Sequence, residues 1–472
     1  MNNILFVPFF KNPIFWTELF HIASILGFLL GIVLITQILR NPRKPSATIG
    51  WLLIVILVPV VGIPLYLTFG DRKFNKLKQK KGNLALPDAV ASINLHPINN
   101  LMVAMGLPAS SNNNHNKFHR DGKQAWHELI KTLESAKRTI DIAIFILGDD
   151  EVGKSILKIL EKKAAVGIKI RLLLDGVGSL TLPKKKLQNL IQNGGQVAWF
   201  IPVLHLPFRG RTNLRNHRKI VIVDKNTVWT GGRNLADEYL GKQCPNSCWV
   251  DLSTTQCGSV VEIYHYIFEA DWNFANNIES EKINEIDAKL KGGNKAIQII
   301  PSGPDVADDP IYVAILNACY LAKRNIRVVT PYFVPNTGLQ EALKLAALRG
   351  VAIDLILPEK SNHRLADIAR RRYLRELHEV GVKVWFIPNK MVHAKAIVFD
   401  DNFALAGSAN LDIRSLFLNC EVMSGFYSSD DVQWLTNWLE KLRNESNLYQ
   451  PPTASILSEM LEGIVLLAAY QL

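Results

Sequence analysis

The sequence repeats an eight-residue pattern that reads HRKIVIVD at residues 217–224 and HAKAIVFD at residues 393–400. Each copy contains a histidine, a lysine two positions later and an aspartate at its end. Side chains two positions apart on a β-strand point to the same face, so the histidine and lysine of each copy project together. The apolar residues of each copy suit a strand that packs inside a sheet. We therefore predict two equivalent strands, each of which presents one His–Lys pair at its start.

The two patterns belong to longer repeated units. AKRTI at residues 136–140 recurs as AKRNI at residues 322–326, and GIKIRLLL at residues 167–174 corresponds to GVAIDLIL at residues 350–357. Each unit alternates helical segments with apolar strands, which is typical of α/β layers. The predicted fold class is therefore α/β, with two α/β/α units of roughly 170 residues that pack as a pseudo-twofold pair.

Packing the two units about a twofold axis would gather His217, Lys219, His393 and Lys395 at a single site. Two lysines neutralise the oxygens of a phosphate and the charge that develops in the transition state. One histidine can attack phosphorus, while the other protonates the leaving alcohol and deprotonates the incoming one. A covalent phosphohistidine divides one difficult step into two easier steps. The set therefore predicts phosphodiester chemistry that uses no metal ion and no other cofactor.

A turn of small residues follows each pattern, reading TGGRN at residues 230–234 and AGSAN at residues 406–410. Small residues allow backbone N–H groups to approach an anion closely. Asn234 and Asn410 can donate hydrogen bonds to the same anion. An ordinary strand-ending turn is the alternative, but both turns follow their His–Lys pair at the same offset. We therefore predict that Asn234 and Asn410 bind phosphate.

The carboxylates near the motifs require separate roles. Alternation along a strand puts Asp224 and Asp400 on the face opposite their histidine and lysine, which predicts a structural role at the strand end. Asp251 lies downstream of the first motif, and Glu421 lies downstream of the second. We predict that each of these two carboxylates orients the histidine of its own unit. The alternative is a pair of ordinary surface carboxylates.

Two uncharged apolar stretches, residues 19–39 and 47–69, precede the repeated units. At a rise of about 1.5 Å per residue, each is long enough as a helix to cross the roughly 30 Å apolar core of a bilayer. The polar turn RNPRKPS at residues 40–46 joins them. We therefore predict a transmembrane hairpin over residues 1–70. The alternatives are two helices buried in a soluble core or, for the first stretch, a cleaved signal peptide.

Basic residues determine the expected orientation of the hairpin. The outer flanks, with Lys11 and the run from Arg72 to Lys81, contain more lysine and arginine than the turn. This asymmetry favours a cytoplasmic catalytic body. Residues 71–117 are predicted to be a basic and polar linker, whose basic run lies on anionic headgroups or is simply solvated. The two repeated units are then expected at residues 118–295 and 296–472.

The chain has 472 residues and a formal net charge of +12. This excess predicts anionic partners such as lipid headgroups, nucleic acid or phosphorylated substrates, without choosing among them. Cys244, Cys248 and Cys257 are close in sequence, but no fourth Cys or His lies at the spacing of a zinc site. We therefore expect no metal centre, and we expect the cysteines to be reduced.

The motifs resemble those of the phospholipase D superfamily, and most closely those of bacterial cardiolipin synthases. The resemblance rests on the two HxKx₄D patterns, on GGRN at residues 231–234 and GSANLDIRS at residues 407–415, and on LYLTFG at residues 65–70. It implies that phosphatidylglycerol gives its phosphatidyl group to an enzyme histidine and releases glycerol. A second phosphatidylglycerol then accepts the group, which yields cardiolipin.

The resemblance also implies roles for individual residues. By analogy, His217 is the nucleophile and His393 is the acid and base. The family pattern counts the aspartate of each motif with the catalytic residues, and counts Ser408 with the phosphate-binding turn. Gly232 stands where the family usually has serine. That departure predicts a weaker phosphate contact in the first turn.

The implied partners are phosphatidylglycerol and anionic membrane lipid, and the implied location is the bacterial inner membrane with several membrane passes. The predicted hairpin favours a lipid substrate, so no nucleic acid partner is expected. The alternatives are a phospholipase D-type hydrolase or nuclease that uses water, and a phosphatidyltransferase that uses a different alcohol. A third alternative is an inactive, membrane-tethered interaction protein. The sequence does not indicate the oligomeric state.

Overall fold

The computed structural model describes residues 13–40, 45–69, 81, 84, 86–87, 96–201, 214–241, 248–278 and 293–467. The chain divides into two compact units. The first comprises residues 1–77 with residues 204–211, and the second comprises residues 78–203 with residues 212–472. The N-terminal helices belong to the first unit, and both motif repeats belong to the second.

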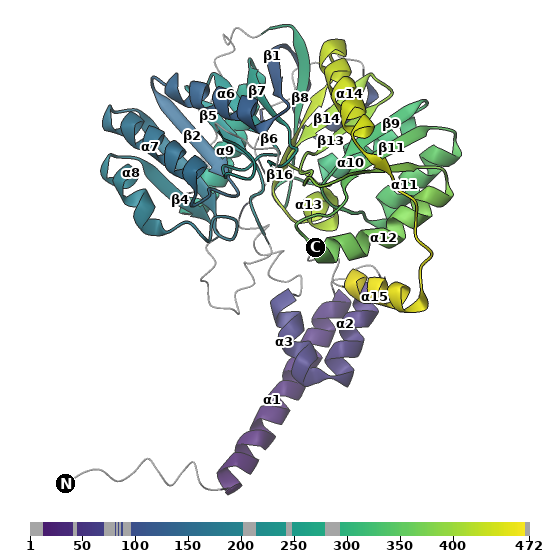
Figure 1. The fold of residues 1–472 in the computed structure, drawn as a ribbon. Helices are drawn as coiled ribbons and strands as arrows, with labels where there is room; N and C mark the ends of the chain where they lie inside the picture. The colour runs from purple at the N-terminus through teal and green to yellow at the C-terminus, as the bar shows by residue number, and fades with distance from the viewer. Residues whose placement is uncertain are drawn as a thin grey trace, which may run out of the picture. The chain divides into compact units, whose positions relative to one another are not determined.

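The described part of the first unit contains three helices (Figure 1), namely α1 (Pro13–Arg40), α2 (Pro45–Leu57) and α3 (Pro59–Phe69). The prediction of one helix over residues 47–69 is wrong, because the stretch is divided at Val58. Pro59 has no N–H to continue the helical ladder. Gly62 allows α3 to approach α2 closely, since a Cβ atom there would lie 2.3 Å from the carbonyl oxygen of Ile54.

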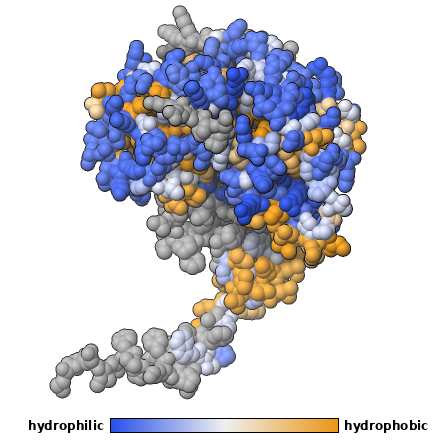
Figure 2. Space-filling model, viewed as in Figure 1, coloured by the Kyte–Doolittle hydropathy of each residue, from blue (hydrophilic) through white to orange (hydrophobic). Residues whose placement is uncertain are grey.

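A small apolar core connects the helices of the first unit. Its buried members are Leu34, Ile38, Val55, Ile63 and Tyr66. Many other large apolar side chains of these helices are exposed, and they form the apolar surface visible on this unit in Figure 2. Of the residues that the structure describes, no helix has both the length and the apolar character that crossing a membrane requires.

In the described part of the chain, the second unit is built on one fifteen-stranded sheet. The first repeat contributes β2 (Thr139–Ile144), β3 (Lys169–Asp175), β4 (Gln196–Phe200), β5 (Ile220–Val223), β6 (Thr227–Gly231) and β7 (Ser253–Cys257). The second contributes β8 (Lys295–Ser302), β9 (Asn325–Val329), β11 (Ala352–Pro358), β12 (Lys383–Ile387), β13 (Ala396–Phe399), β14 (Phe403–Gly407), β16 (Glu421–Phe426) and β17 (Asn447–Leu448).

Corresponding strands have the same order in both halves of this sheet, β4-β3-β2-β5-β6-β7 and β12-β11-β9-β13-β14-β16. In each half, three parallel strands are followed by an antiparallel motif strand, β5 or β13. The prediction of an α/β fold with two repeated units is therefore confirmed. Two short strands, β10 (Phe333–Val334) and β15 (Leu411–Asp412), form a separate parallel pair.

Strand β1 (Ser111–His119) joins the two halves, because it pairs with β7 on one side and with β8 on the other. It lies near the middle of the sheet in Figure 1. The prediction that residues 71–117 form only a loose linker is therefore wrong for this segment. Asn114 is buried, and its amide group donates to the carbonyl oxygens of Ser111 and Lys295. This polar side chain can lie inside the sheet because its hydrogen bonds are satisfied there.

Helices cover the sheet and bury an apolar core in each half. They are α5 (Pro97–Ala104), α6 (Gly122–Glu134), α7 (Glu151–Ala165), α8 (Gln188–Gln192), α9 (Val260–Asn276), α10 (Pro310–Leu321), α11 (Thr337–Leu348), α12 (Arg364–Glu379), α13 (Ile413–Phe417) and α14 (Ser429–Asn444). The last helix, α15 (Ile456–Leu467), packs on α12 instead. Helix α7 illustrates the local cause. Asp150 caps it by accepting from the N–H of Gly153, and Ile156 and Leu160 on one face are fully buried.

Candidate active site

Two backbone bridges bring the motif strands to the joint between the repeats. Asn216 pairs with Cys420, and Val250 pairs with Val392, both in parallel orientation. The N–H of His217 donates to the carbonyl oxygen of Cys420 at 2.9 Å. The N–H of His393 donates in the same way to Val250 at 2.7 Å. Each histidine is therefore fixed by the backbone of the opposite repeat.

Each motif histidine also bonds a carboxylate of the opposite repeat. His217 Nδ1 lies 2.9 Å from Glu421 Oε1, and His393 Nδ1 lies 2.7 Å from Asp251 Oδ2. The prediction that each carboxylate serves the histidine of its own repeat is wrong. The two predicted residues are the partners, but they are exchanged. The exchange follows from the bridges, because Glu421 adjoins Cys420 and Asp251 adjoins Val250.

The two motif lysines are buried beside their histidines. Lys219 Nζ donates to the carbonyl oxygen of His217 at 2.7 Å, and Lys395 Nζ donates to that of His393. Lys395 Nζ also lies 2.7 Å from His393 Nδ1. Burial lowers the pKa of Lys219 well below its usual range and lowers the pKa of Lys395 to about 8. An arriving phosphate would stabilise both ammonium groups.

Burial also keeps both histidines neutral. It lowers the pKa of His217 to about 4 and that of His393 to about 3, against the opposing effect of Glu421 and Asp251. A neutral imidazole that donates from Nδ1 to a carboxylate has its lone pair on Nε2. Either histidine can therefore act as a nucleophile or as a base through Nε2.

Aromatic rings that the sequence prediction missed confine both imidazoles. Phe145 meets the His217 ring edge-on at 4.9 Å between centroids, and Lys219 Nζ lies 5.5 Å from the centroid of the same phenylalanine. Tyr239 and Trp249 pack against His393 at 5.0 and 5.5 Å. Trp249 lies two positions before Asp251, the predicted carboxylate partner of a histidine, and this proximity in sequence could have indicated that Trp249 also lies at the site.

Asp224 and Asp400 lie at the far end of their motif strands from the histidines. Each is the first residue of a three-residue turn and has a positive φ, 53° at Asp224 and 50° at Asp400; the turns join β5 to β6 and β13 to β14. The Asp224 carboxylate accepts from the N–H groups of residues 137–139, and the Asp400 carboxylate accepts from those of residues 323–325. Burial raises the pKa of each carboxyl group, but these backbone donors outweigh it and lower the pKa overall.

The turn residues proposed for phosphate binding have other partners in this structure. Ser408 Oγ donates to Glu421 Oε2. Asn234 Oδ1 accepts from the N–H of Ile146 at 3.3 Å. The side chain of Asn410 bonds Asp412. The hydroxyl of Ser408 therefore contacts the partner of His217.

Gly232 is the counterpart of Ser408 in the first repeat. A Cβ atom at Gly232 would lie 2.2 Å from Asp251 Oδ1, so a side chain has no room there. The sequence predicts that this glycine weakens a phosphate contact. In the structure, Gly232 instead leaves space for the side chain of Asp251, whose carboxylate bonds His393.

The described residues include no cluster of three or more His, Cys, Asp or Glu side chains that could hold a metal ion. Cys257, Cys319 and Cys420 are free thiols. Cys248 is disulfide-bonded, so the prediction of reduced cysteines is wrong for this residue. Sequence spacing alone does not indicate which thiols come within bonding distance.

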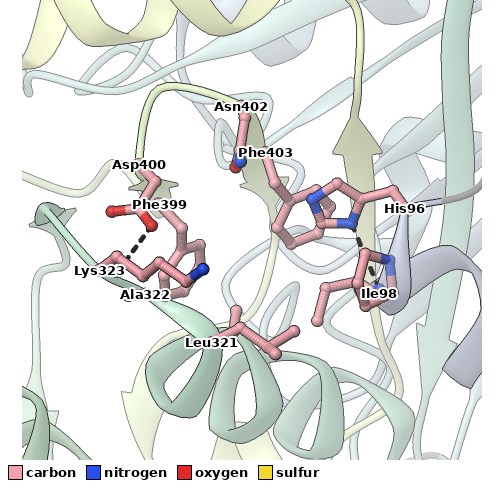
Figure 3. Close-up of a pocket in the computed structure, with 11 residues that line it drawn as sticks. His96, Ile98, Leu321, Ala322, Lys323, Phe399, Asp400, Asn402 and Phe403 are labelled. Carbon is pink, nitrogen blue, oxygen red and sulfur yellow. Dashed lines mark hydrogen bonds between the residues drawn. The ribbon is translucent and has the colours of Figure 1, made fainter.

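One pocket, of about 280 Å³, lies apart from the motif histidines. Figure 3 shows its wall, in which the Asp400 carboxylate accepts from the backbone N–H of Lys323. His96 and Phe403 line the opposite side. The pocket therefore adjoins the turn end of β13 and not its catalytic end.

Comparison with known proteins places the chain in a family. The family described as "Cardiolipin synthase, PLD-like domain" matches residues 129–272 and 315–443, and "Phospholipase_D-nuclease N-terminal" matches residues 29–70. A cardiolipin synthase of Listeria innocua is 33% identical to this chain, and the aligned region covers 87% of this chain and 92% of the Listeria protein. The major cardiolipin synthase of Bacillus subtilis is 34% identical to this chain, and the aligned region covers 85% of this chain and 88% of the Bacillus protein.

The solved structure of phosphatidylserine synthase from Haemophilus influenzae has a similar fold, with a TM-score of 0.57 and 15% identity over 84% of this chain and 97% of that chain. The repeated fold and the paired His–Lys motifs define a phospholipase D-like protein. The chain belongs to the cardiolipin synthase family of such proteins.

Proposed function

We propose that this protein is a cardiolipin synthase that moves a phosphatidyl group from one phosphatidylglycerol to another through a phosphohistidine. The observation that carries the proposal is the pair of buried His–Lys sets, each with a carboxylate from the opposite repeat on Nδ1 of its histidine. That arrangement leaves two imidazole Nε2 atoms and two ammonium groups available to one phosphodiester.

In the first half-reaction, Nε2 of His217 attacks phosphorus and the bond from phosphorus to the glycerol oxygen breaks. His393 gives its proton to that oxygen, and glycerol leaves. The negative charge of the bound phosphodiester raises the pKa of His393, which allows it to hold this proton in the complex. Glu421 stabilises the cationic phosphohistidine form of the His217 ring.

In the second half-reaction, His393 takes the proton from a hydroxyl of a second phosphatidylglycerol. The hydroxyl oxygen attacks phosphorus, the bond to His217 breaks, and cardiolipin leaves. Lys219 and Lys395 neutralise the phosphoryl oxygens in both steps. Asn234 and Asn410, on the turns after the motif strands, remain our candidates for direct phosphate contacts when the substrate is bound.

We propose that the first unit associates with the bacterial inner membrane and that the catalytic body is cytoplasmic. The support is the exposed apolar surface of α1–α3, which includes Phe28 at 70% and Val60 at 85% exposure. Helix α15 adds a second apolar face, with Leu457 exposed at 79% and Ile464 at 62%. Both surfaces suit lipid more than water.

The test is the product formed by the purified full-length protein on phosphatidylglycerol vesicles. Cardiolipin and glycerol should appear in equal amounts, and His217→Ala or His393→Ala should lower the rate by about 10³-fold or more. Phosphatidic acid in place of cardiolipin would identify a hydrolase. A phosphatidyl ester of another added alcohol would identify a different acceptor.

A further inference from the structure

Lys81 is buried inside the catalytic body, although the sequence prediction put it in a basic run that lies on anionic headgroups or is solvated. Its side chain is only 1% exposed. The N–H of Leu84, three positions later, donates to the carbonyl oxygen of Asp305 at 2.7 Å. Leu84 and Leu86 pack on the core of the second repeat. Lys81, Leu84 and Leu86 of the predicted linker are therefore built into the catalytic body.

The Lys81 ammonium group belongs to a buried network of four charges. Nζ lies 2.6 Å from Asp271 Oδ1 and 2.9 Å from Asp305 Oδ2. Arg218 binds the same two carboxylates, at 2.8 Å to Asp271 and 3.4 Å to Asp305. All four side chains are at most 1% exposed. Two positive and two negative charges balance, so removing one would leave an uncompensated buried charge.

The network contacts the residues on both sides of His217. Arg218 follows this histidine, and Asn216 before it donates from Nδ2 to Asp271 Oδ2 at 2.9 Å. Arg218 Nε also donates to the backbone carbonyl oxygen of Glu421 at 3.1 Å. The network therefore holds the backbone of both His217 and its carboxylate partner.

Lys81 adds a further contact on the Glu421 side. Its Nζ lies 3.3 Å from Sγ of Cys420, which is bonded directly to Glu421 along the chain. The Cys420 thiol is neutral, since burial raises its pKa to about 12. Lys81 thus contacts the first repeat through Asp271 and the second repeat through Asp305 and Cys420.

The second motif has no equivalent of this arrangement at its corresponding positions. Val392 and Ala394 flank His393, where Asn216 and Arg218 flank His217. Apolar side chains cannot join an ionic network. The buried charges therefore serve one histidine of the pair and break the pseudo-twofold symmetry of the site.

We propose that Lys81 is a positioning residue, which fixes His217 against Glu421 through the buried Asp271, Asp305 and Arg218 charges. The inference rests on the proposed function, because its effect is a change in the rate at which His217 takes up the phosphatidyl group. A residue from the segment between α3 and α5 thereby completes the support of the nucleophile.

The test is single-turnover formation of the phosphatidyl-enzyme from labelled phosphatidylglycerol, with full-length protein. Lys81→Met should slow formation about tenfold or more in the folded enzyme while KM changes less than about twofold, and Lys81→Arg should recover most of the rate. Lys154→Met is the matched control, because the Lys154 side chain is 53% exposed and pairs with Glu151 on the surface.

A second variant separates positioning from folding. Lys81→Met combined with Asp305→Asn leaves one buried ion pair, so its thermal unfolding should lie close to that of the wild type while formation of the phosphatidyl-enzyme stays slow. Wild-type rates in this folded double variant would overturn the inference. Absence of both phosphatidyl-enzyme and cardiolipin with the wild type would instead overturn the proposed function.

Discussion

His217 and His393 each depend on a carboxylate that the other repeat supplies. Both partners, Glu421 and Asp251, could be selected from the sequence, because each is an acidic residue downstream of a motif. Their exchange could not be predicted, because sequence distance does not state which half of a pseudo-twofold pair a side chain faces. The backbone bridges at Cys420 and Val250 decide it.

A double-mutant cycle on stability tests this exchange. His217→Gln and Glu421→Gln should couple by at least about 1 kcal/mol, because the side chains are in contact. His217→Gln and Asp251→Asn should couple by clearly less. Urea unfolding of the four variants in each cycle provides the free energies. A larger coupling within the first repeat would contradict the exchanged pairs.

Substitution of Gly232 tests the match between this residue and Asp251. Gly232→Ser should lower stability by about 2 kcal/mol and reduce kcat, because the new Cβ meets Asp251 Oδ1. Gly463→Ser is the control, since a Cβ at Gly463 has nothing within 4 Å. Thermal unfolding and turnover are measured for both variants. Equal losses of stability and kcat in the two variants would contradict the close packing of Gly232 against Asp251.

The buried histidines predict how stability depends on pH. The pKa is lowered to about 4 for His217 and about 3 for His393, so between pH 6.5 and 4 the unfolded chain binds protons that the native chain does not. Stability should fall as the pH decreases through this window, by about 1.4 kcal/mol per pH unit for each such histidine. His393→Gln should make the dependence shallower in urea unfolding, and an unchanged slope would disagree with a neutral buried His393.

At the scale of the elements, the motif strands are held at both ends by different groups. The catalytic end is held by the exchanged backbone bridges, and the turn end by Asp224 or Asp400. Strand alternation could separate Asp from His and Lys without a structure. It could not identify the backbone N–H groups that each carboxylate accepts from, because these belong to segments far away in sequence.

Replacing either turn aspartate should therefore affect stability more than chemistry. Asp224→Asn or Asp400→Asn should lower stability by about 1 kcal/mol, less than is usual for hydrogen bonds to a buried charged group, because both carboxylates are partly exposed. In the folded enzyme, kcat should remain within roughly threefold of the wild-type value. A loss of kcat on the scale of the histidine variants would assign these aspartates to the chemistry.

Helix α15 gives an element-scale test of membrane contact. Leu457→Glu with Ile464→Glu should lower kcat/KM on phosphatidylglycerol vesicles by about fivefold or more, since two exposed apolar anchors are lost. Activity on dispersed short-chain phosphatidylglycerol should stay unchanged. Leu180→Glu with Leu348→Glu is the matched control, because these leucines lie outside α15 and have side chains that are 64% and 68% exposed. Equal losses in both pairs would contradict a specific role for α15.

At the scale of the whole molecule, the repeated α/β architecture and the convergence of two His–Lys pairs could be read from the sequence, because both follow from periodicity and duplication. Three features could not. Strand β1 is polar yet central, and the second apolar stretch is divided at Val58. Lys81 belongs to a basic run in the sequence but lies in a buried network of charges. Each depends on contacts between distant segments, which local patterns do not contain.

The most direct test of the account is to map the phosphatidyl group on the enzyme. Full-length protein is mixed with phosphatidylglycerol labelled in its phosphatidyl group, quenched within one turnover and digested, and the labelled residue is identified. We predict label on His217 in the wild type, loss of that label on adding unlabelled phosphatidylglycerol, and its recovery in cardiolipin. Label on His393 would reverse the assigned roles, and cardiolipin formed with no labelled histidine would contradict the phosphohistidine mechanism.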